Sequence, residues 1–99
     1  MHKLVVTYKN PENPEAFDKY YHDTHVPLAN KVPKVKEIRI NKVFGSPAGK
    51  ADLYLIAELC FENKEDFKAG LNSPEMAATG EDLKNFAVGL ASLYFVEEK

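Results

Sequence analysis

The chain has 99 residues, of which 44% are hydrophobic and 28% are charged. This length and balance are typical of one small globular domain spanning residues 1–99, and they argue against a disordered or fibrous chain. The formal net charge of −2 and the lack of Lys/Arg clusters exclude the basic patch that binding to nucleic acid or to an anionic membrane usually requires.

The single cysteine, Cys60, excludes an internal disulfide and is typical of a reducing compartment. It lies in an apolar run with no neighbouring base, which favours a buried strand residue over a reactive thiol. The first residues form a strand pattern without a signal-peptide core, and no apolar run approaches the roughly 20 residues of a membrane helix. We therefore expect a cytoplasmic protein.

The chain begins with a strand and a helix. Residues 3–9 are β-branched and aromatic, which favours a strand. Asn13 can cap a helix that begins with Pro14 at its first position. Larger side chains follow at helical spacing: Phe17, Tyr20, Tyr21, Thr24 and Leu28.

Pro27 interrupts this helix because it cannot donate a backbone hydrogen bond, so the helix is expected to end or kink near His25. Residues 35–44 predict a second strand, residues 45–50 a turn-rich loop and residues 52–62 a third strand.

The rest of the chain predicts helices and a last strand. Asn63 can cap a short helix that contains Phe67 and Leu71, and a second helix begins at Ser73 and Pro74. Its apolar stripe consists of Met76, Gly80, Leu83, Phe86 and Ala87. Residues 91–97 predict the closing strand.

A short repeat within the sequence helps to define the topology. Residues 12–17 and 62–67 share the pattern Glu-Asn-x-Glu-x-Phe, and each follows a strand and opens a helix. This agrees with two successive β-α-β halves. We predict an α+β, ferredoxin-like β-α-β-β-α-β fold, in which a four-stranded antiparallel sheet carries its helices on one face.

The second face of this sheet is also partly apolar, because the alternate residues Tyr54, Ile56, Glu58 and Cys60 are only half polar. Packing against a second copy would bury it, which predicts a homodimer through the sheet face. The alternative is a monomer in which Arg39 and Lys36 cover that face.

Most catalytic templates are missing from the sequence. There is no Gly-rich phosphate loop and no Cys-x-x-Cys pair. His22 and His25 could share one helix face, but a third ligand is not evident, so we expect neither a metal nor a cofactor.

His25 remains as the best candidate for chemistry. At about 100° per residue, His25 borders the buried stripe of its helix, while His22 faces solvent. A partly buried imidazole beside Tyr21 suits general acid–base catalysis, because its pKa lies near neutrality. The alternative is that His25 only stabilises the turn at the kink, and that Tyr21 is a core residue.

This segment resembles the signature of the EthD family, named for ethyl tert-butyl ether degradation, within the dimeric α+β barrel superfamily. The matching residues are Phe17, Tyr20, Tyr21, His25, Pro27, Leu28 and Ala29, with a second region in Ser73–Ala78, Asp82-Leu83 and Asn85–Ala87. Two positions depart from the family pattern: Tyr21 replaces a frequent tryptophan, and Lys34 a common glycine.

The resemblance implies a homodimeric barrel with a small apolar cavity between sheet and helices, and cofactor-free chemistry on a small apolar ligand. One expectation is a lyase, an isomerase or a monooxygenase-like enzyme in which His25 and Tyr21 act on a carbonyl compound. Tyr8, Phe86 and Leu28 would then bind the substrate. The alternatives are a non-catalytic dimer that binds a small ligand, and a structural subunit whose cavity is too small for any ligand.

Overall fold

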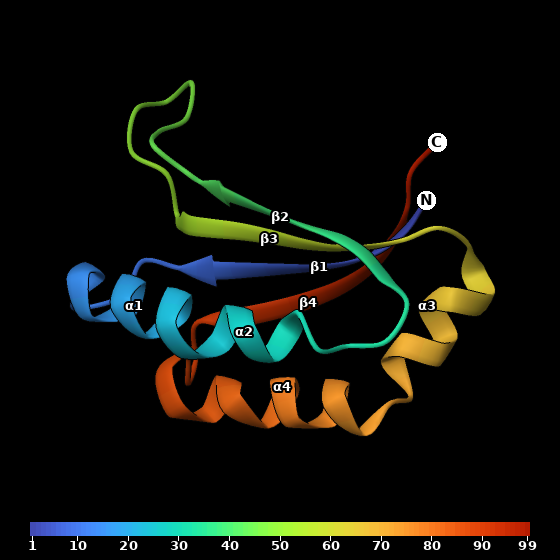
Figure 1. The fold of residues 1–99 in the computed structure, drawn as a ribbon. Coiled ribbons are helices and arrows are strands. Elements are labelled where there is room, and N and C mark those ends of the chain that lie inside the picture. The colour runs from blue at the N-terminus through green and yellow to red at the C-terminus, as the bar shows by residue number, and fades with distance from the viewer.

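The computed structural model describes residues 1–99 and has a four-stranded antiparallel sheet in the order β2-β3-β1-β4 (Figure 1). The helices lie together on one face of this sheet, which confirms the predicted ferredoxin-like α+β fold. In chain order the elements are β1 (His2–Lys9), α1 (Pro14–Tyr20), η1 (Tyr21–His25), α2 (Val26–Ala29), β2 (Val35–Lys42), β3 (Leu53–Phe61), α3 (Lys64–Leu71), α4 (Pro74–Phe86) and β4 (Ala91–Glu97).

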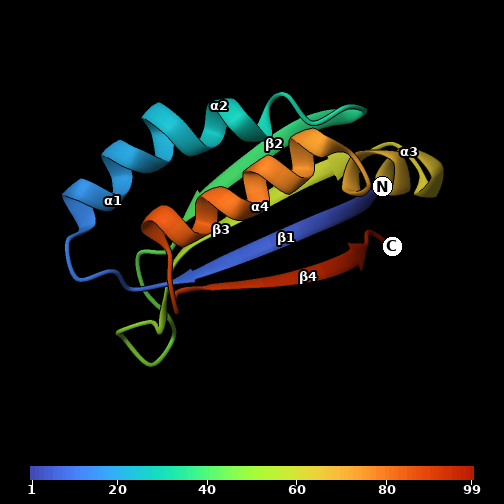
Figure 2. The same cartoon turned by 90° about the horizontal axis from the view of Figure 1, so that it is seen from below.

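The core lies between β1, β3 and the helices. Leu4, Val6 and Tyr8 alternate along β1 toward the helices and are all buried. Their partners on β3 include Ala57 and Leu59, which are buried as well. Strand β4 pairs with the other side of β1 but lies at the sheet edge, beyond the cover of the helices (Figure 2).

Local signals start the helices where the sequence predicts. The Asn13 side chain accepts a hydrogen bond from the backbone N–H of Ala16 at 3.1 Å, and Pro14 follows at the first position of α1. Ser73 caps α4 in the same way through the N–H of Met76. Such caps satisfy backbone donors that have no partner within the helix.

The first helix does not end near His25, so the predicted end is wrong, but the helix does depart from regular α geometry there. It continues to Ala29 through a π-helical turn, η1, in which the N–H of Val26 donates to the carbonyl of Tyr21, five residues earlier. A π turn inserts one extra residue and commonly relieves a local conflict in a helix. Pro27 follows this turn directly, in the first turn of α2, where a proline is tolerated.

A second correction concerns Tyr54. The pairing of β1 and β3 shifts register between Tyr8 and Lys9, and this irregularity turns Tyr54 toward the helices instead of the opposite face. Its hydroxyl donates to the Asp18 carboxylate of α1 at 2.8 Å, and its ring packs edge-on against Phe17. The bulge therefore ties β3 to α1.

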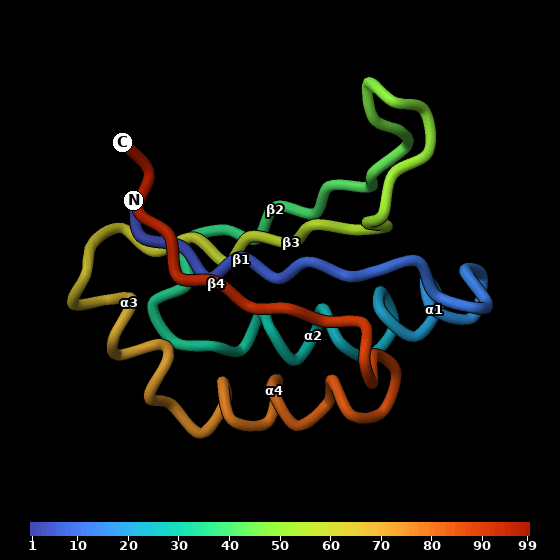
Figure 3. Tube along the Cα trace, turned by 180° about the vertical axis from the view of Figure 1, so that it is seen from behind, coloured from blue at the N-terminus to red at the C-terminus, as the bar shows by residue number.

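The other face of the sheet carries no helix, as Figure 3 shows from behind. Lys3, Glu58 and Arg39 form an ion-paired centre there, with Lys3 Nζ 3.5 Å from Glu58 Oε1 and Arg39 Nη1 3.9 Å from the same oxygen. Cys60 is buried, as predicted. The apolar part of this face lies on β4, where Tyr94 is 54% exposed. None of the helices has the length and apolar character needed to cross a bilayer.

Candidate functional site

A buried histidine–aspartate pair joins the two long helical segments. His25, at the end of η1, and Asp82, in the middle of α4, are each 5% exposed. The His25 Nδ1 lies 2.9 Å from Asp82 Oδ2. This bond assigns the ring proton to Nδ1, because an ionised carboxylate can only accept, and it leaves Nε2 as a free acceptor.

Asp82 is held by two further donors. The Tyr20 hydroxyl donates to Oδ1 at 2.6 Å, and the Asn85 amide donates to the same oxygen at 2.9 Å. Burial by itself raises the pKa of Asp82, but the donors Tyr20, Asn85 and His25 outweigh it and hold the pKa below its usual value. The carboxylate is therefore ionised at neutral pH and can fix the imidazole in one tautomer.

The His25 ring packs against two aromatic rings, Tyr21 and Phe86, whose centroids are themselves 6.0 Å apart. It stacks on Tyr21 with ring centroids 5.5 Å apart and contacts Phe86 at 4.8 Å. Burial lowers the pKa of His25, while the hydrogen bond and the charge of Asp82 oppose that shift. An imidazole that stays neutral at pH 7 is suited to accept a proton.

The Nε2 atom of His25 makes no hydrogen bond to the protein, because Nδ1 makes the single bond of the ring. No fully buried side-chain nitrogen or oxygen lacks a partner. Nε2 must therefore border open space, and His25 indeed lines a cavity between the helices and the sheet.

This cavity has a volume of about 30 Å³, room for about two water molecules. Its lining is mostly apolar and consists of Leu4, Val6, Tyr8, Tyr21, His25, Val26, Ala29, Ile38, Ala57, Leu59, Met76, Thr79, Gly80, Leu83 and Leu93. Burial raises the pKa of Tyr21 to about 12 and that of Tyr8 well above its usual range. Both phenols are thus protonated. A hydrogen bond between the two hydroxyls adds to the raised pKa of Tyr8 and opposes that of Tyr21, so Tyr8 is its donor and the Tyr21 proton is left to donate to a ligand.

The structure places three of the five predicted site residues in the cavity lining, namely His25, Tyr21 and Tyr8. Phe86 packs against all three rings, with centroids 4.8 Å from His25 and 6.0 Å from Tyr8 and Tyr21, but it borders an outer hollow instead of the cavity. Leu28 lies away from the cavity, in a shallow hollow between α2 and the start of α4.

The π turn explains the position of Leu28. A regular helix would place Leu28 on the same face as Phe17. The extra residue in η1 rotates the following turn, so that Val26 and Ala29 line the cavity in its place. The predicted helical wheel therefore fails after Tyr21.

The prediction of chemistry from single residues missed Asp82, Tyr20 and Asn85 as a connected group. The sequence does contain a signal, because Asp82 lies one turn before Phe86 and therefore falls on the apolar side of its helix. A carboxylate at such a position needs a partner when it is buried. In this structure the partner is His25.

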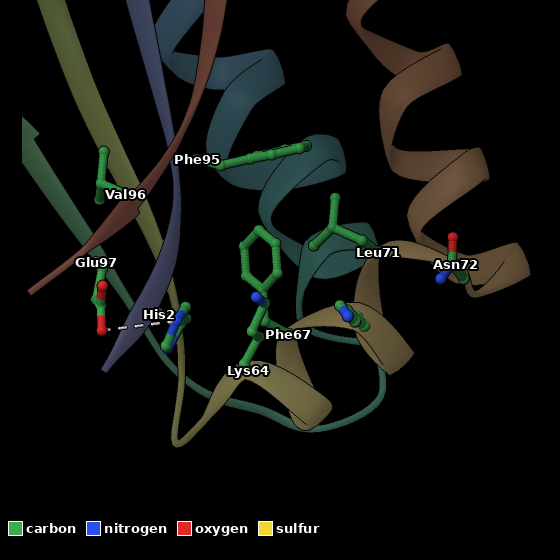
Figure 4. A pocket seen from close by; sticks show the side chains of 9 residues that line it. His2, Lys64, Phe67, Leu71, Asn72, Phe95, Val96 and Glu97 are labelled. Atoms are coloured by element: carbon green, nitrogen blue, oxygen red, sulfur yellow. Dashed lines mark ion pairs between the residues drawn. The ribbon is translucent and has the colours of Figure 1, made fainter.

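A separate open groove of about 710 Å³ lies between α3 and β4 (Figure 4). Phe67 and Leu71 of α3 face Phe95 of β4, and His2 lies 3.9 Å from Glu97 beside them. The pair of His2 and Glu97 in this groove is not buried, unlike the pair of His25 and Asp82. No group of three or more His, Cys, Asp or Glu side chains is placed to hold a metal ion.

The fold and the site together define a class of protein, a ferredoxin-like α+β subunit that holds a histidine–aspartate pair against a small apolar cavity. The family model of the EthD domain matches residues 9–89. The chain belongs to the EthD family, as its resemblance to that family predicts.

Two proteins resemble the chain over its full length. An uncharacterised 11.0 kDa protein from the thcB-thcC intergenic region of Rhodococcus erythropolis is 32% identical, with 100% of this chain and 96% of that protein covered. The crystal structure of an ethyl tert-butyl ether (EthD) family protein from Bacillus halodurans has 34% identity and a TM-score of 0.94, covering 100% of this chain and 99% of that one.

More distant structures share the fold. The hydroxynitrile lyase from Passiflora edulis has 15% identity and a TM-score of 0.69, covering 99% of this chain and 94% of that one. A dimeric ferredoxin-like protein of unknown function from Jannaschia has 14% identity and a TM-score of 0.68, covering 99% of this chain and all of that one. The fold therefore occurs in dimers and in an enzyme.

Proposed function

We propose that the protein is a cofactor-independent lyase or isomerase that acts on a small, uncharged, apolar carbonyl compound, with His25 as general acid and base. The observation that carries this proposal is that His25 lines the cavity with its Nδ1 bonded to Asp82, which fixes the tautomer and leaves Nε2 without a partner in the protein. The Passiflora edulis protein, a lyase on the same fold, supports the reaction class.

The chemistry needs only the groups that line the cavity. Nε2 of His25 takes a proton from the carbon next to the carbonyl group, and the C–H electron pair moves to form an enolate. The Tyr21 hydroxyl, which accepts a hydrogen bond from Tyr8, donates its own proton to the developing oxyanion. In an isomerase the enolate is conjugated with a C=C bond of the substrate, and the imidazolium returns the proton to the far carbon as the double bond shifts. In a lyase the enolate electron pair forms a C=C bond, the bond from the β-carbon to the leaving group breaks, and the leaving group takes up the proton.

The lining also favours an uncharged substrate. It contains no lysine, arginine or carboxylate, and its single ionisable group near neutrality is His25, whose pKa is lowered by burial. A carboxylate substrate would lose its hydration without gaining an ionic partner. An apolar ketone or aldehyde loses little and gains one or two hydrogen bonds.

A non-catalytic role in ligand binding is the second candidate, and the mostly apolar lining of the cavity favours it. A volume of about 30 Å³ admits a ligand only if rim side chains such as Met76, Leu83 and Leu93 move aside. The cavity's small volume is instead what a purely structural subunit predicts. A purely structural role, however, does not explain why Nε2 of His25 lacks a hydrogen-bond partner in the protein.

Proton exchange on simple ketones separates these roles. Butanone, cyclohexanone and acetophenone in D₂O report base catalysis by loss of their α-proton NMR signals, and amide shifts of the ¹⁵N-labelled protein report binding. We expect His25→Ala to lower the exchange rate about 10²–10⁴-fold, while the exposed His22→Gln control behaves as wild type. Exchange that survives His25→Ala would overturn the catalytic role; binding without exchange in the wild type would support the ligand-binding role.

We also propose that the protein forms a homodimer through the sheet face opposite the helices. The exposed Tyr94 and Val96 on β4 supply apolar area for such an interface, next to the ion-paired centre. A stable interface buries about 800 Å² per partner. The double variant Tyr94→Glu/Val96→Glu should run as a monomer in light scattering; a wild type that is monomeric at high concentration would refute the dimer. The free Cys60 is in keeping with a cytoplasmic location.

A further inference from the structure

We propose that Gly80 sets the size of the molecule that the His25 cavity admits, an inference that rests on the proposed function. Gly80 lies in the interior of α4 and lines the cavity together with Met76 and Leu83, one turn to either side. Glycine destabilises a helix interior relative to alanine, so its presence here calls for a reason.

The fold itself does not require a glycine at this position. A Cβ atom added to Gly80 would meet no atom within 4 Å, and its backbone has no positive φ. Gly70 of α3 is the opposite case, because a Cβ there would overlap the Phe61 ring. Packing therefore explains Gly70 but leaves Gly80 unexplained.

The empty space at Gly80 lies at the exposed end of the cavity. Gly80 is itself exposed, whereas Thr79, the preceding residue of the lining, is buried. Across from α4 in the lining stands Leu93 of β4, which is 50% exposed because no helix covers the edge of the sheet (Figure 2). The gap between α4 and β4 is therefore the path along which a ligand reaches His25.

A side chain at position 80 would narrow this path. In an apolar site one methylene more or less on the ligand changes its relative rate by about 10–200-fold, so bulkier ligands are excluded first as the side chain at position 80 grows. Glycine gives the widest opening that an α-helix can offer, at the expense of helix stability. This is the pattern expected of a residue kept for function.

Gly80→Ala and Gly80→Val test the inference with the same ketone series. We expect Gly80→Ala to raise Tm by roughly 2–8 °C and to lower the ratio of acetophenone to butanone exchange about tenfold. Gly80→Val should lower that ratio more than 100-fold while butanone exchange changes far less. Binding, read from ¹⁵N shifts, should follow the same order.

A matched variant separates size selection from helix stability. Ala78 lies on the exposed side of α4, outside the cavity lining, so Ala78→Gly should lower Tm without changing the selectivity. The double variant Gly80→Ala/Ala78→Gly should restore the wild-type Tm and keep the altered ratio.

Three results would overturn the inference. One is a size profile unchanged in Gly80→Val while exchange still depends on His25, which leaves the proposed function intact. Another is an unchanged profile with a changed molecular mass in light scattering, which would assign the space at Gly80 to a second copy. The third is a wild type that binds none of the ketones, which removes the proposed function and this inference together.

Discussion

Asp82→Asn is the most informative single change, because it alters one atom of the side chain and removes its charge. In the protein Asp82 Oδ1 accepts from Tyr20 and Asn85, and Oδ2 accepts from His25 Nδ1. An asparagine has one side-chain oxygen, which can accept either from Tyr20 and Asn85 or from His25. Accepting from Tyr20 and Asn85 keeps two hydrogen bonds, so the new NH₂ group should face His25.

The imidazole must then change its tautomer. Nδ1 becomes an acceptor for the asparagine amide, and the proton moves to Nε2, the atom that faces the cavity. Nε2 can no longer accept a proton from a substrate. The free energy of unfolding should fall by about 2 kcal/mol, because hydrogen bonds to a charged acceptor become neutral ones while the smaller desolvation cost of an amide offsets part of the loss.

The tautomer can be read directly from the ¹⁵N chemical shifts of the His25 ring, independently of activity. We expect Asp82→Asn to move the proton to Nε2 and to lower ketone exchange about 10²–10⁴-fold. Tyr20→Phe is the control: it removes one donor but leaves the charge, so the proton should stay on Nδ1 and exchange should fall no more than about tenfold. A wild-type tautomer with wild-type exchange in Asp82→Asn would refute the reasoning.

The remaining predictions concern pH and the backbone. Since burial lowers the pKa of His25 below 6.5, the folded protein resists its protonation. The free energy of unfolding should therefore fall as the pH drops below about 6.5, and ketone exchange should fall only at lower pH, below the lowered pKa of His25 in the folded protein. His25→Gln but not His22→Gln should remove this dependence of stability. Lys34 has a φ of 69°, so Lys34→Gly should raise the unfolding free energy by about 1 kcal/mol in urea titrations; no gain would refute backbone strain there. Gly70→Ala should lower it by about 1–3 kcal/mol, because the new methyl group overlaps the Phe61 ring, and a neutral result would contradict that overlap.

The strands, the caps and the topology could be predicted from the sequence because each rests on a local signal. Asn13 and Ser73 cap helices through bonds to residues three positions ahead, and alternation along β1 defines its buried face. Features that depend on a one-residue irregularity could not be predicted. The bulge that turns Tyr54 inward and the π turn that moves Leu28 aside both shift the phase of an otherwise regular element.

The candidate site was predictable only in part, for a related reason. His25 stood out by its residue type and its place beside Pro27, but the bond that defines its tautomer joins positions 25 and 82, 57 residues apart. Sequence spacing carries no information on such a long-range contact. By contrast, the sequence alone showed that Lys34 departs from the EthD family pattern, which commonly has glycine at this position. The positive φ of Lys34 explains that preference for glycine.

The π turn also bears on how relatives of different length are compared with this chain. The buried residues Phe17, Tyr21, His25 and Ala29 follow one another every four positions, a wider spacing than the 3.6 residues of a regular helix. A homologue with one residue fewer between Tyr21 and His25 could present the same inward side chains on an unbroken α-helix. A one-residue gap at this point of an alignment would then mark a homologue without the π turn. The histidine that follows the gap would still be the equivalent of His25.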